Sequence, residues 1–222
     1  PYLSRGLGDV YKRQIQHRMK QLLYAGALLL APVLAFAGGN DDAPTRYQVD
    51  AKSSTVTWEG TKVTGAHNGN IAISNGMISV NDGLISAATV IIDMTTINTL
   101  DLDGGAKESL DGHLSSDDFF GVETYPTAQF ELLKLNPLRG GENGANFSAT
   151  GKVTIKGRTD EVTFPVKVDM SDVGARISGE MILDRSQFDV RFRSKSFFDA
   201  KKLGDKLIYN DFTIGFELVA GK

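Results

Sequence analysis

The chain of 222 residues contains no cysteine. No disulfide can therefore stabilise it, no thiolate can act as a nucleophile, and no thiol is available for a lipid anchor. A surplus of basic residues is also absent. Residues 38–222 hold 19 Lys and Arg against 26 Asp and Glu, a formal charge of about −7. This sign is wrong for a nucleic-acid binder, which must neutralise phosphates, and stability must come from a buried apolar core.

Signatures of nucleophilic catalysis are missing as well. His67 and His113 are far apart in the sequence, and neither Ser115 nor Ser116 lies in a Gly-x-Ser-x-Gly elbow. Isolated histidines of this kind are usually satisfied loop residues. We therefore expect a protein that is not an enzyme and has no cofactor.

One acidic segment begins like a calcium loop. Asp101 and Asp103 have the spacing of the first two ligands, but Gly105 and Gly112 stand where an EF-hand needs its third ligand and its bidentate Glu. An EF-hand is therefore rejected. A looser calcium site from Asp101, Asp103 and Asp111 stays open, although we expect no metal.

The first 37 residues have the pattern of a targeting segment. A basic start at Met19-Lys20 precedes an apolar run over 22–36, and Ala35-Phe36-Ala37 has the small-x-small form of a cleavage site. The run is too short to span a bilayer comfortably. We expect an upstream segment at 1–18, a cleaved secretory signal at 19–37, a flexible mature N-terminus at 38–46 and one domain at 47–220. The protein would then be periplasmic or secreted.

Beyond Asp50 the apolar residues recur with a period of two. Val162, Phe164, Val166 and Val168 alternate with polar or less apolar neighbours, as in a strand with one dry face. Comparable runs start at Val56, Ala88, Ala128 and Phe212. Turn signals separate the runs: Asn68-Gly69, Asn75-Gly76, Asp82-Gly83, Gly140 to Gly144, Lys156-Gly157 and Val173-Gly174. The pattern predicts an all-β antiparallel meander.

A long sheet with one dry face must close on itself or pack on a second sheet. Closure of about eight strands gives an up-and-down barrel that can hold side chains or a small ligand. A β-sandwich fits the same periodicity. The residues from Lys107 to Leu114 and from Ser115 to Phe120 are expected to form a short helical insert over the barrel, with Ser115 or Ser116 as a cap.

Three sequence blocks resemble the YceI-like family. They are HLSSDDFFGVETYPTAQF from His113, ATGKVTIKGRT from Ala149 with VTFPV from Val162, and LDRSQFDV from Leu183. The resemblance implies an antiparallel, lipocalin-like barrel that binds a polyisoprenoid or isoprenoid quinone. Leu110 stands where many members have the Arg of an Arg-Asp-x-His-Leu pattern. Trp58-Glu59-Gly60 and Ser196 to Asp199 are similar to a Bacteroidetes-type subgroup, so the lipid can differ.

A cargo of this kind would require an enclosed apolar interior, since each buried methylene gains about 0.8 kcal/mol. Phe119 and Phe120 are expected at a lid, and His113 is a candidate contact for a quinone-like head group. The inward candidates are Val56, Trp58, Ile71, Ile73, Val90, Ile92, Phe130, Leu132, Phe164, Val166, Met181, Leu183, Phe212, Ile214 and Phe216. Small residues interspersed among them (Ala72, Ala88, Ala128 and Gly179) favour a hollow over a close-packed core.

Other interpretations stay open at this point. One is a secreted β-sandwich interaction module without cargo. Another is a barrel hydrolase or isomerase, although the dry faces supply no acid or base. The cluster of Arg185, Arg191, Arg193 and Lys195 is expected on a solvated strand face, or beside the barrel mouth near an acidic head group. Phe197-Phe198 fits either a homodimer contact or a second plug.

Overall fold

Strands make up most of the described chain, which is residues 43–221 of the computed structural model. The segments expected at 1–18 and 19–37 lie outside the described residues. The strands are β1 (Thr45–Val49), β2 (Thr55–Lys62), β3 (Gly65–Asn81), β4 (Leu84–Thr99), β5 (Thr127–Pro137), β6 (Phe147–Ile155), β7 (Arg158–Ser171), β8 (Gly174–Asp184) and β9 (Ile208–Gly221). The helices are α2 (Gly104–Ser115), α3 (Ala200–Leu203), and the 3-10 turns η1 (Glu142–Gly144), η2 (Arg185–Phe188) and η3 (Gly204–Lys206).

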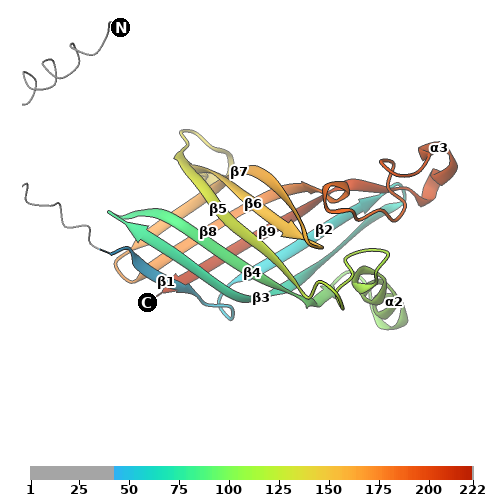
Figure 1. Cartoon of the computed structure of the whole chain (residues 1–222), viewed down its shortest axis with the longest axis horizontal. Coiled ribbons are helices and arrows are strands. Elements are labelled where there is room, and N and C mark those ends of the chain that lie inside the picture. The colour runs from blue at the N-terminus through green and yellow to red at the C-terminus, as the bar shows by residue number, and fades with distance from the viewer. Residues whose placement is uncertain (1–42, 222) are drawn as a thin grey trace, which may run out of the picture. The chain divides into compact units, whose positions relative to one another are not determined.

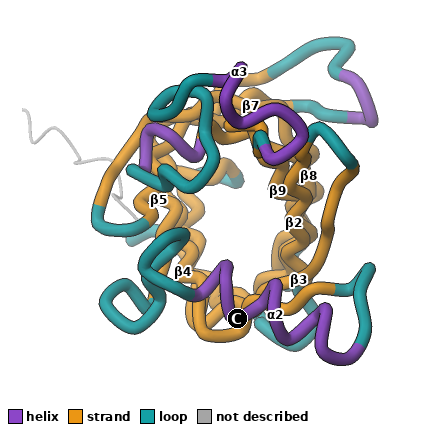
Figure 2. The backbone as a smooth tube through the Cα atoms, turned by 90° about the vertical axis from the view of Figure 1, so that its right-hand side faces the viewer, coloured by secondary structure: helices purple, strands orange, loops and turns teal. Residues whose placement is uncertain are grey.

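Strands β2 to β9 close into an antiparallel barrel in which every strand pairs with its neighbours in the chain (Figures 1 and 2). The closing pair is β2 with β9, which runs from Thr55 opposite Glu217 to Lys62 opposite Ile208. This architecture confirms the predicted up-and-down barrel of about eight strands and excludes the β-sandwich. The inward faces carry the alternating apolar residues, so the core is the barrel interior.

Strand β1 is the additional strand. It pairs with β3 through Thr45 opposite Val80 and with β9 through Val49 opposite Ala220. It therefore fills the gap between β3 and β9 at the end that β2 does not reach. Because β1 begins at Thr45, the last two residues of the segment expected to be flexible belong to the sheet.

The two ends of the barrel are built differently. The end that we call the hairpin end carries the β3–β4, β5–β6 and β7–β8 connections together with β1. The opposite end, called the helical end, carries α2, η2 and α3 (Figures 1 and 2).

Two local predictions were wrong. Asn68-Gly69 and Asn75-Gly76 do not form turns, because both lie inside the long strand β3, where Gly69 pairs with Thr99 and Gly76 with Val90. Helix α2 begins at Gly104 rather than near Lys107, and Ser116 is at its C-terminus, where its hydroxyl donates to His113 O at 2.7 Å. Asp82-Gly83 and Lys156-Gly157 are turns as expected, and the turn expected at Val173-Gly174 lies one residue earlier, at Asp172-Val173.

Candidate functional site

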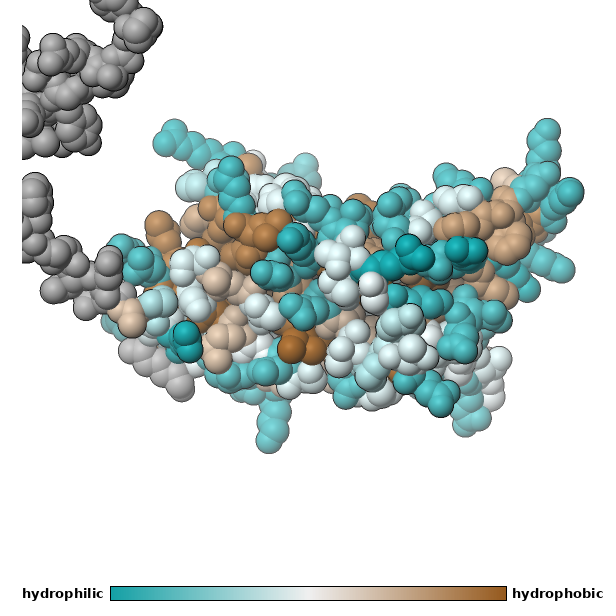
Figure 3. Space-filling model, viewed as in Figure 1, coloured by the Kyte–Doolittle hydropathy of each residue, from teal (hydrophilic) through white to brown (hydrophobic). Residues whose placement is uncertain are grey.

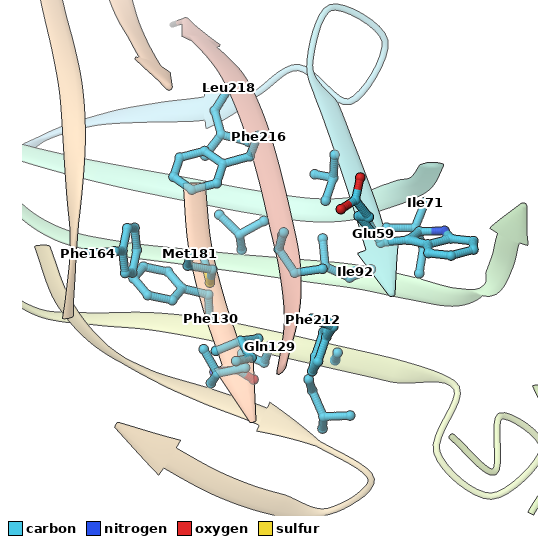
Figure 4. A pocket seen from close by; sticks show the side chains of 18 of the residues that line it. Glu59, Ile71, Ile92, Gln129, Phe130, Phe164, Met181, Phe212, Phe216 and Leu218 are labelled. Atoms are coloured by element: carbon cyan, nitrogen blue, oxygen red, sulfur yellow. The ribbon is translucent and has the colours of Figure 1, made fainter. Parts of the chain in front are cut away.

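The barrel encloses an apolar cavity of about 230 Å³ to which all eight closing strands contribute. Figure 4 shows side chains from several strands converging on it, among them Phe130, Phe164 and Phe216. The strands position these residues through their period of two, which places every second side chain inside a closed barrel.

Sixteen of the eighteen side chains expected to contact cargo line this cavity. They are Val56, Trp58, Ile71, Val90, Ile92, Phe119, Phe120, Phe130, Leu132, Phe164, Val166, Met181, Leu183, Phe212, Ile214 and Phe216. Ile73 and His113 do not line it. Pairing of β3 with β4 shifts on both sides of Ile73, which lies buried in the core outside the lining row. Whether the sixteen bind a ligand stays a prediction.

Further lining residues were not predicted. They include Ile78, Ile85, Ile97, Leu114, Leu135, Ala149, Val153, Ile155, Val168, Ile177 and Leu218. Most continue the same period of two along strands already recognised, so extending each run to its turn would have found them. Ala88, Ala128 and Gly179 lie on inward positions as expected. Ala72 does not, because its side chain is exposed on the outer face of β3.

Aromatic rings form a connected part of the cavity wall. Phe164 meets Phe130 with ring centroids 5.7 Å apart and Phe216 at 5.9 Å, both edge to face. Phe212 meets Phe120 at 6.5 Å in the same manner. Edge-to-face pairs are a favoured aromatic geometry and fix ring positions. This part of the wall therefore offers C–H groups and π faces to whatever occupies the cavity.

Glycines on neighbouring strands make room for these rings. A Cβ at Gly69 would lie 2.5 Å from Trp58 Cε2, and a Cβ at Gly151 would lie 2.5 Å from Phe130 Cζ. Gly179 has the same relation to Phe216 Cζ at 3.0 Å. Each ring thus lies over a glycine and against the wall, so the aromatic residues line the barrel without filling it.

A segment that we call the lid covers part of the helical end of the cavity. Leu114 of α2 and the following Phe119 and Phe120 all line the cavity, and the two Phe rings pack edge to face at 5.0 Å. Lys156 in the β6–β7 turn donates from Nζ to the carbonyl oxygens of Asp117 and Phe119, both at 2.8 Å. A single ammonium group therefore ties the lid to the barrel rim.

Helix α2 is attached to β4 through Asp111. The buried Thr99 donates to Asp111 Oδ1 from its backbone N at 2.9 Å and from its hydroxyl at 2.6 Å, and Lys107 pairs with Oδ2. Burial acts to raise the pKa of Asp111, but the hydrogen bonds from Lys107 and Thr99 outweigh it, so the pKa lies below its ordinary value. The ionised carboxylate is thus the form that holds the helix.

Arg185 is a buried charge beside the cavity, contrary to the expected solvated strand face. It donates to the carbonyl oxygens of Tyr209, Val190 and Ile208 at 2.9 to 3.0 Å, and its guanidinium carbon lies 5.5 Å from the Phe119 ring centroid. Burial lowers its pKa to about 10, so it stays charged at neutral pH. Arg185 therefore binds η2 to the start of β9. Arg191, Arg193 and Lys195 are exposed on the loop that follows.

Two buried polar atoms in the described part of the chain have no hydrogen-bond partner. They are Nε1 of Trp58, whose side chain lines the cavity, and Nε2 of His113. The His113 ring lies edge on to Phe192 at 4.4 Å and to Phe119 at 5.7 Å, behind the lid. The structure thus places His113 in an aromatic cluster that supports the lid.

The acidic residues near α2 do not assemble into a metal site. Asp101 accepts from His67 Nδ1 at 2.8 Å and from the Asn68 backbone, while Asp111 binds Thr99 and Lys107. Within residues 43–221 no three His, Asp or Glu side chains gather closely enough to hold a metal ion. The helices in that part of the chain are also too short or too polar to cross a lipid bilayer.

Comparisons with known proteins match this chain to one family model and to several solved structures. A family model described as the YceI-like domain matches residues 47–220. No curated protein matches the chain. Among solved structures, BcnA of Burkholderia cenocepacia is 24% identical with a TM-score of 0.59, over 77% of this chain and 98% of the other. A polyisoprenoid binding domain from Saccharophagus degradans, implicated in plant cell wall breakdown, is 14% identical with a TM-score of 0.54, over 79% and 97%.

Proposed function

The chain belongs to the YceI-like family, and from this membership together with the cavity we propose that it is an exported lipid-binding protein. Its cargo is a long isoprenoid chain, either a polyisoprenoid or an isoprenoid quinone, held in the barrel interior without chemical change. The observation that carries the proposal is the enclosed cavity, whose wall is built by apolar side chains from every closing strand. The interior of an interaction module without cargo would be close-packed, as protein interiors normally are.

The size of the cavity sets a scale for the cargo. A single buried water needs about 10 to 15 Å³ of such volume, so the cavity of about 230 Å³ is many times larger than a hydration site. It therefore has room for several linked carbon groups of an isoprenoid. A longer chain would fold on itself or extend past the lid.

Several features support a carrier rather than an enzyme. The one buried ionic side chain among the described residues, Arg185, is engaged by backbone carbonyl oxygens. His113 lies behind the lid rather than in the cavity. Trp58 Nε1 has no protein partner, and an oxygen atom on a cargo molecule such as a quinone could accept its hydrogen bond.

Native mass spectrometry of the exported protein, purified without added lipid and followed by organic extraction, tests the proposal. We expect a stoichiometric apolar adduct of isoprenoid class. A clean apo mass, with no uptake when the protein is incubated with geranylgeraniol or an isoprenoid quinone, would overturn it.

A matched pair of variants locates the cargo. Ala88 lines the cavity, whereas the next residue on β4, Ala87, is exposed on the outer face. Ala88→Phe places a ring in the cavity and should lower isoprenoid occupancy by about tenfold or more, since the ring takes up space that the cargo needs. Ala87→Phe should leave occupancy unchanged. Equal occupancy in both folded variants would place the cargo elsewhere.

A further inference from the structure

The connection between η2 and β9 is strongly basic in an otherwise acidic protein. Residues 190–209, called here the basic rim, contain six Lys and Arg against two Asp. The six are Arg191, Arg193, Lys195, Lys201, Lys202 and Lys206, and all are exposed. Arg191 pairs with Asp189, but the other five have no carboxylate within ion-pair distance in the described part of the chain. The positive charge of this surface is therefore not neutralised by its surroundings.

Large apolar side chains are exposed on the same segment. Phe197 and Phe198 are 39% and 51% exposed, and Tyr209 at the start of β9 is 44% exposed. Arg191 lies over the Phe197 ring at 5.1 Å. In Figure 3 apolar residues and projecting hydrophilic side chains lie side by side at the end that carries α3 in Figure 1. Basic side chains interleaved with exposed aromatic rings are the combination that binds the interface of an anionic bilayer.

The basic rim is continuous with the cavity. Tyr209 is both exposed and part of the cavity lining, and Ile208 and Phe212 line the cavity beside it. Here the pairing of β2 with β9 is irregular, with a shift between Gly60 and Lys62. The exposed Val63 joins the same surface, since its backbone N donates to Leu207 O at 3.2 Å. Apolar surface thus extends from the interior to the outside at one place on the helical end.

The other side of the helical end has the opposite charge. Residues 101–123, which include α2 and the lid, contain seven Asp and Glu against one Lys. Figure 2 shows α3 and α2 on opposite sides of the barrel axis. An anionic surface would attract the basic rim and repel the α2 side, so contact would be made in one orientation.

We propose that the basic rim docks on an anionic lipid bilayer and brings the cavity mouth at Tyr209 to the membrane, where isoprenoid cargo is exchanged. This inference rests on the proposed function, because isoprenoids reside in bilayers. The charge of the rim argues for a bilayer over a second copy of the chain. A two-fold pairing through this surface would place six basic residues against the same six.

Sedimentation with lipid vesicles tests the docking separately from cargo binding. Protein would be mixed with vesicles of phosphatidylcholine alone or with a quarter of phosphatidylglycerol, and uptake of geranylgeraniol from solution would be measured in parallel. We expect binding to the anionic vesicles only, with loss at high salt. Lys201→Glu with Lys202→Glu should weaken this binding by more than tenfold, given about fivefold for each basic charge near a bilayer surface.

Phe197→Ser with Phe198→Ser should also weaken vesicle binding several-fold, while both double variants take up geranylgeraniol like the wild type. The matched controls lie away from the rim and are exposed. Lys52→Glu with Lys134→Glu tests charge, and Leu84→Ser with Val173→Ser tests apolar surface. These controls should bind vesicles normally.

Each alternative outcome has a definite meaning. Wild-type protein that takes up geranylgeraniol but ignores anionic vesicles would overturn the docking and leave the proposed function intact. The docking would also be overturned if the rim variants and the control variants lost vesicle binding to the same extent. A dimer that Phe197→Ser with Phe198→Ser converts to a monomer, without vesicle binding by the wild type, would assign the rim to self-association. Failure of geranylgeraniol uptake would instead contradict the proposed function.

Discussion

The hairpin end and the helical end of the barrel are covered by different kinds of interaction. At the hairpin end Tyr47 and Val49 of β1 are buried, and β1 is hydrogen-bonded on both sides by β3 and β9. Neither side chain lines the cavity. At the helical end the closing groups are Phe119 and Phe120, which line the cavity and belong to an insert between two strands.

This difference shows where the barrel can open. Separating β1 would break backbone hydrogen bonds to two strands and expose the buried Tyr47 and Val49. Displacing the lid breaks two hydrogen bonds from Lys156 and the packing of a few rings. Cargo should therefore pass the helical end, and changes at the two ends should separate stability from ligand exchange.

The largest effect is expected for Arg185→Met. The substitution leaves the buried Val190 oxygen and the part-buried Tyr209 and Ile208 oxygens without their donor and should lower the free energy of unfolding by about 3 kcal/mol. Urea denaturation measures the loss. Arg185→Lys should recover little of it, because one ammonium cannot reproduce the guanidinium geometry. A stability within 1 kcal/mol of the wild type would show that the arginine does not hold this end together.

Tyr47→Ala should have the next largest effect, at the hairpin end. Removing a buried ring from β1 should cost about 3 kcal/mol of unfolding free energy while the rate of cargo release stays unchanged. Thermal or urea unfolding measures the change in stability, and a release assay measures the rate at which cargo leaves. The neighbouring exposed Arg46 supplies the control, since Arg46→Ala should change neither. Faster release in folded Tyr47→Ala would mean that cargo leaves through the hairpin end.

Phe120→Asp should have the opposite effect to Tyr47→Ala: weaker cargo retention in a protein that stays folded. A carboxylate at the lid faces an apolar cavity and should weaken cargo retention by about tenfold, with circular dichroism still showing a folded sheet. Phe198→Asp is the matched control, because Phe198 is exposed at the same end and does not line the cavity. In a membrane-free assay it should retain cargo normally. Unchanged cargo occupancy in folded Phe120→Asp would show that Phe120 does not act as part of the lid.

The smallest effect is a loosening of α2 at low pH. Because the pKa of Asp111 is lowered in the folded protein, its contribution is present above the ordinary carboxyl pKa and is lost as pH falls through the lowered value. The contribution should be about 1 kcal/mol or less. Hydrogen exchange at α2, corrected for the intrinsic rate, should therefore increase below about pH 4 while exchange at β1 does not. Asp111→Asn should abolish the pH dependence, and its persistence there would assign it to another group.

Sequence periodicity was sufficient for the strands and for most of their inward side chains, because a period of two fixes which residues share a face. The barrel itself was favoured over a sandwich through the family resemblance, since both architectures have the same periodicity. Periodicity failed where pairing is irregular, as at Ile73 and Ala72 of β3. Arg185 was placed wrongly for a different reason. Its burial depends on the carbonyl groups of Ile208 and Tyr209, far along the chain, and local pattern contains no information about such partners.

Trp58 is the single tryptophan of the chain, and it lies in the cavity wall with its ring over Gly69. All indole emission of the protein therefore originates in the cavity wall. Filling the cavity should change that emission, and a quinone should quench it by electron transfer where a polyisoprenol would not. The protein thus contains its own optical reporter, able to record both occupancy and the chemical class of the occupant without any label.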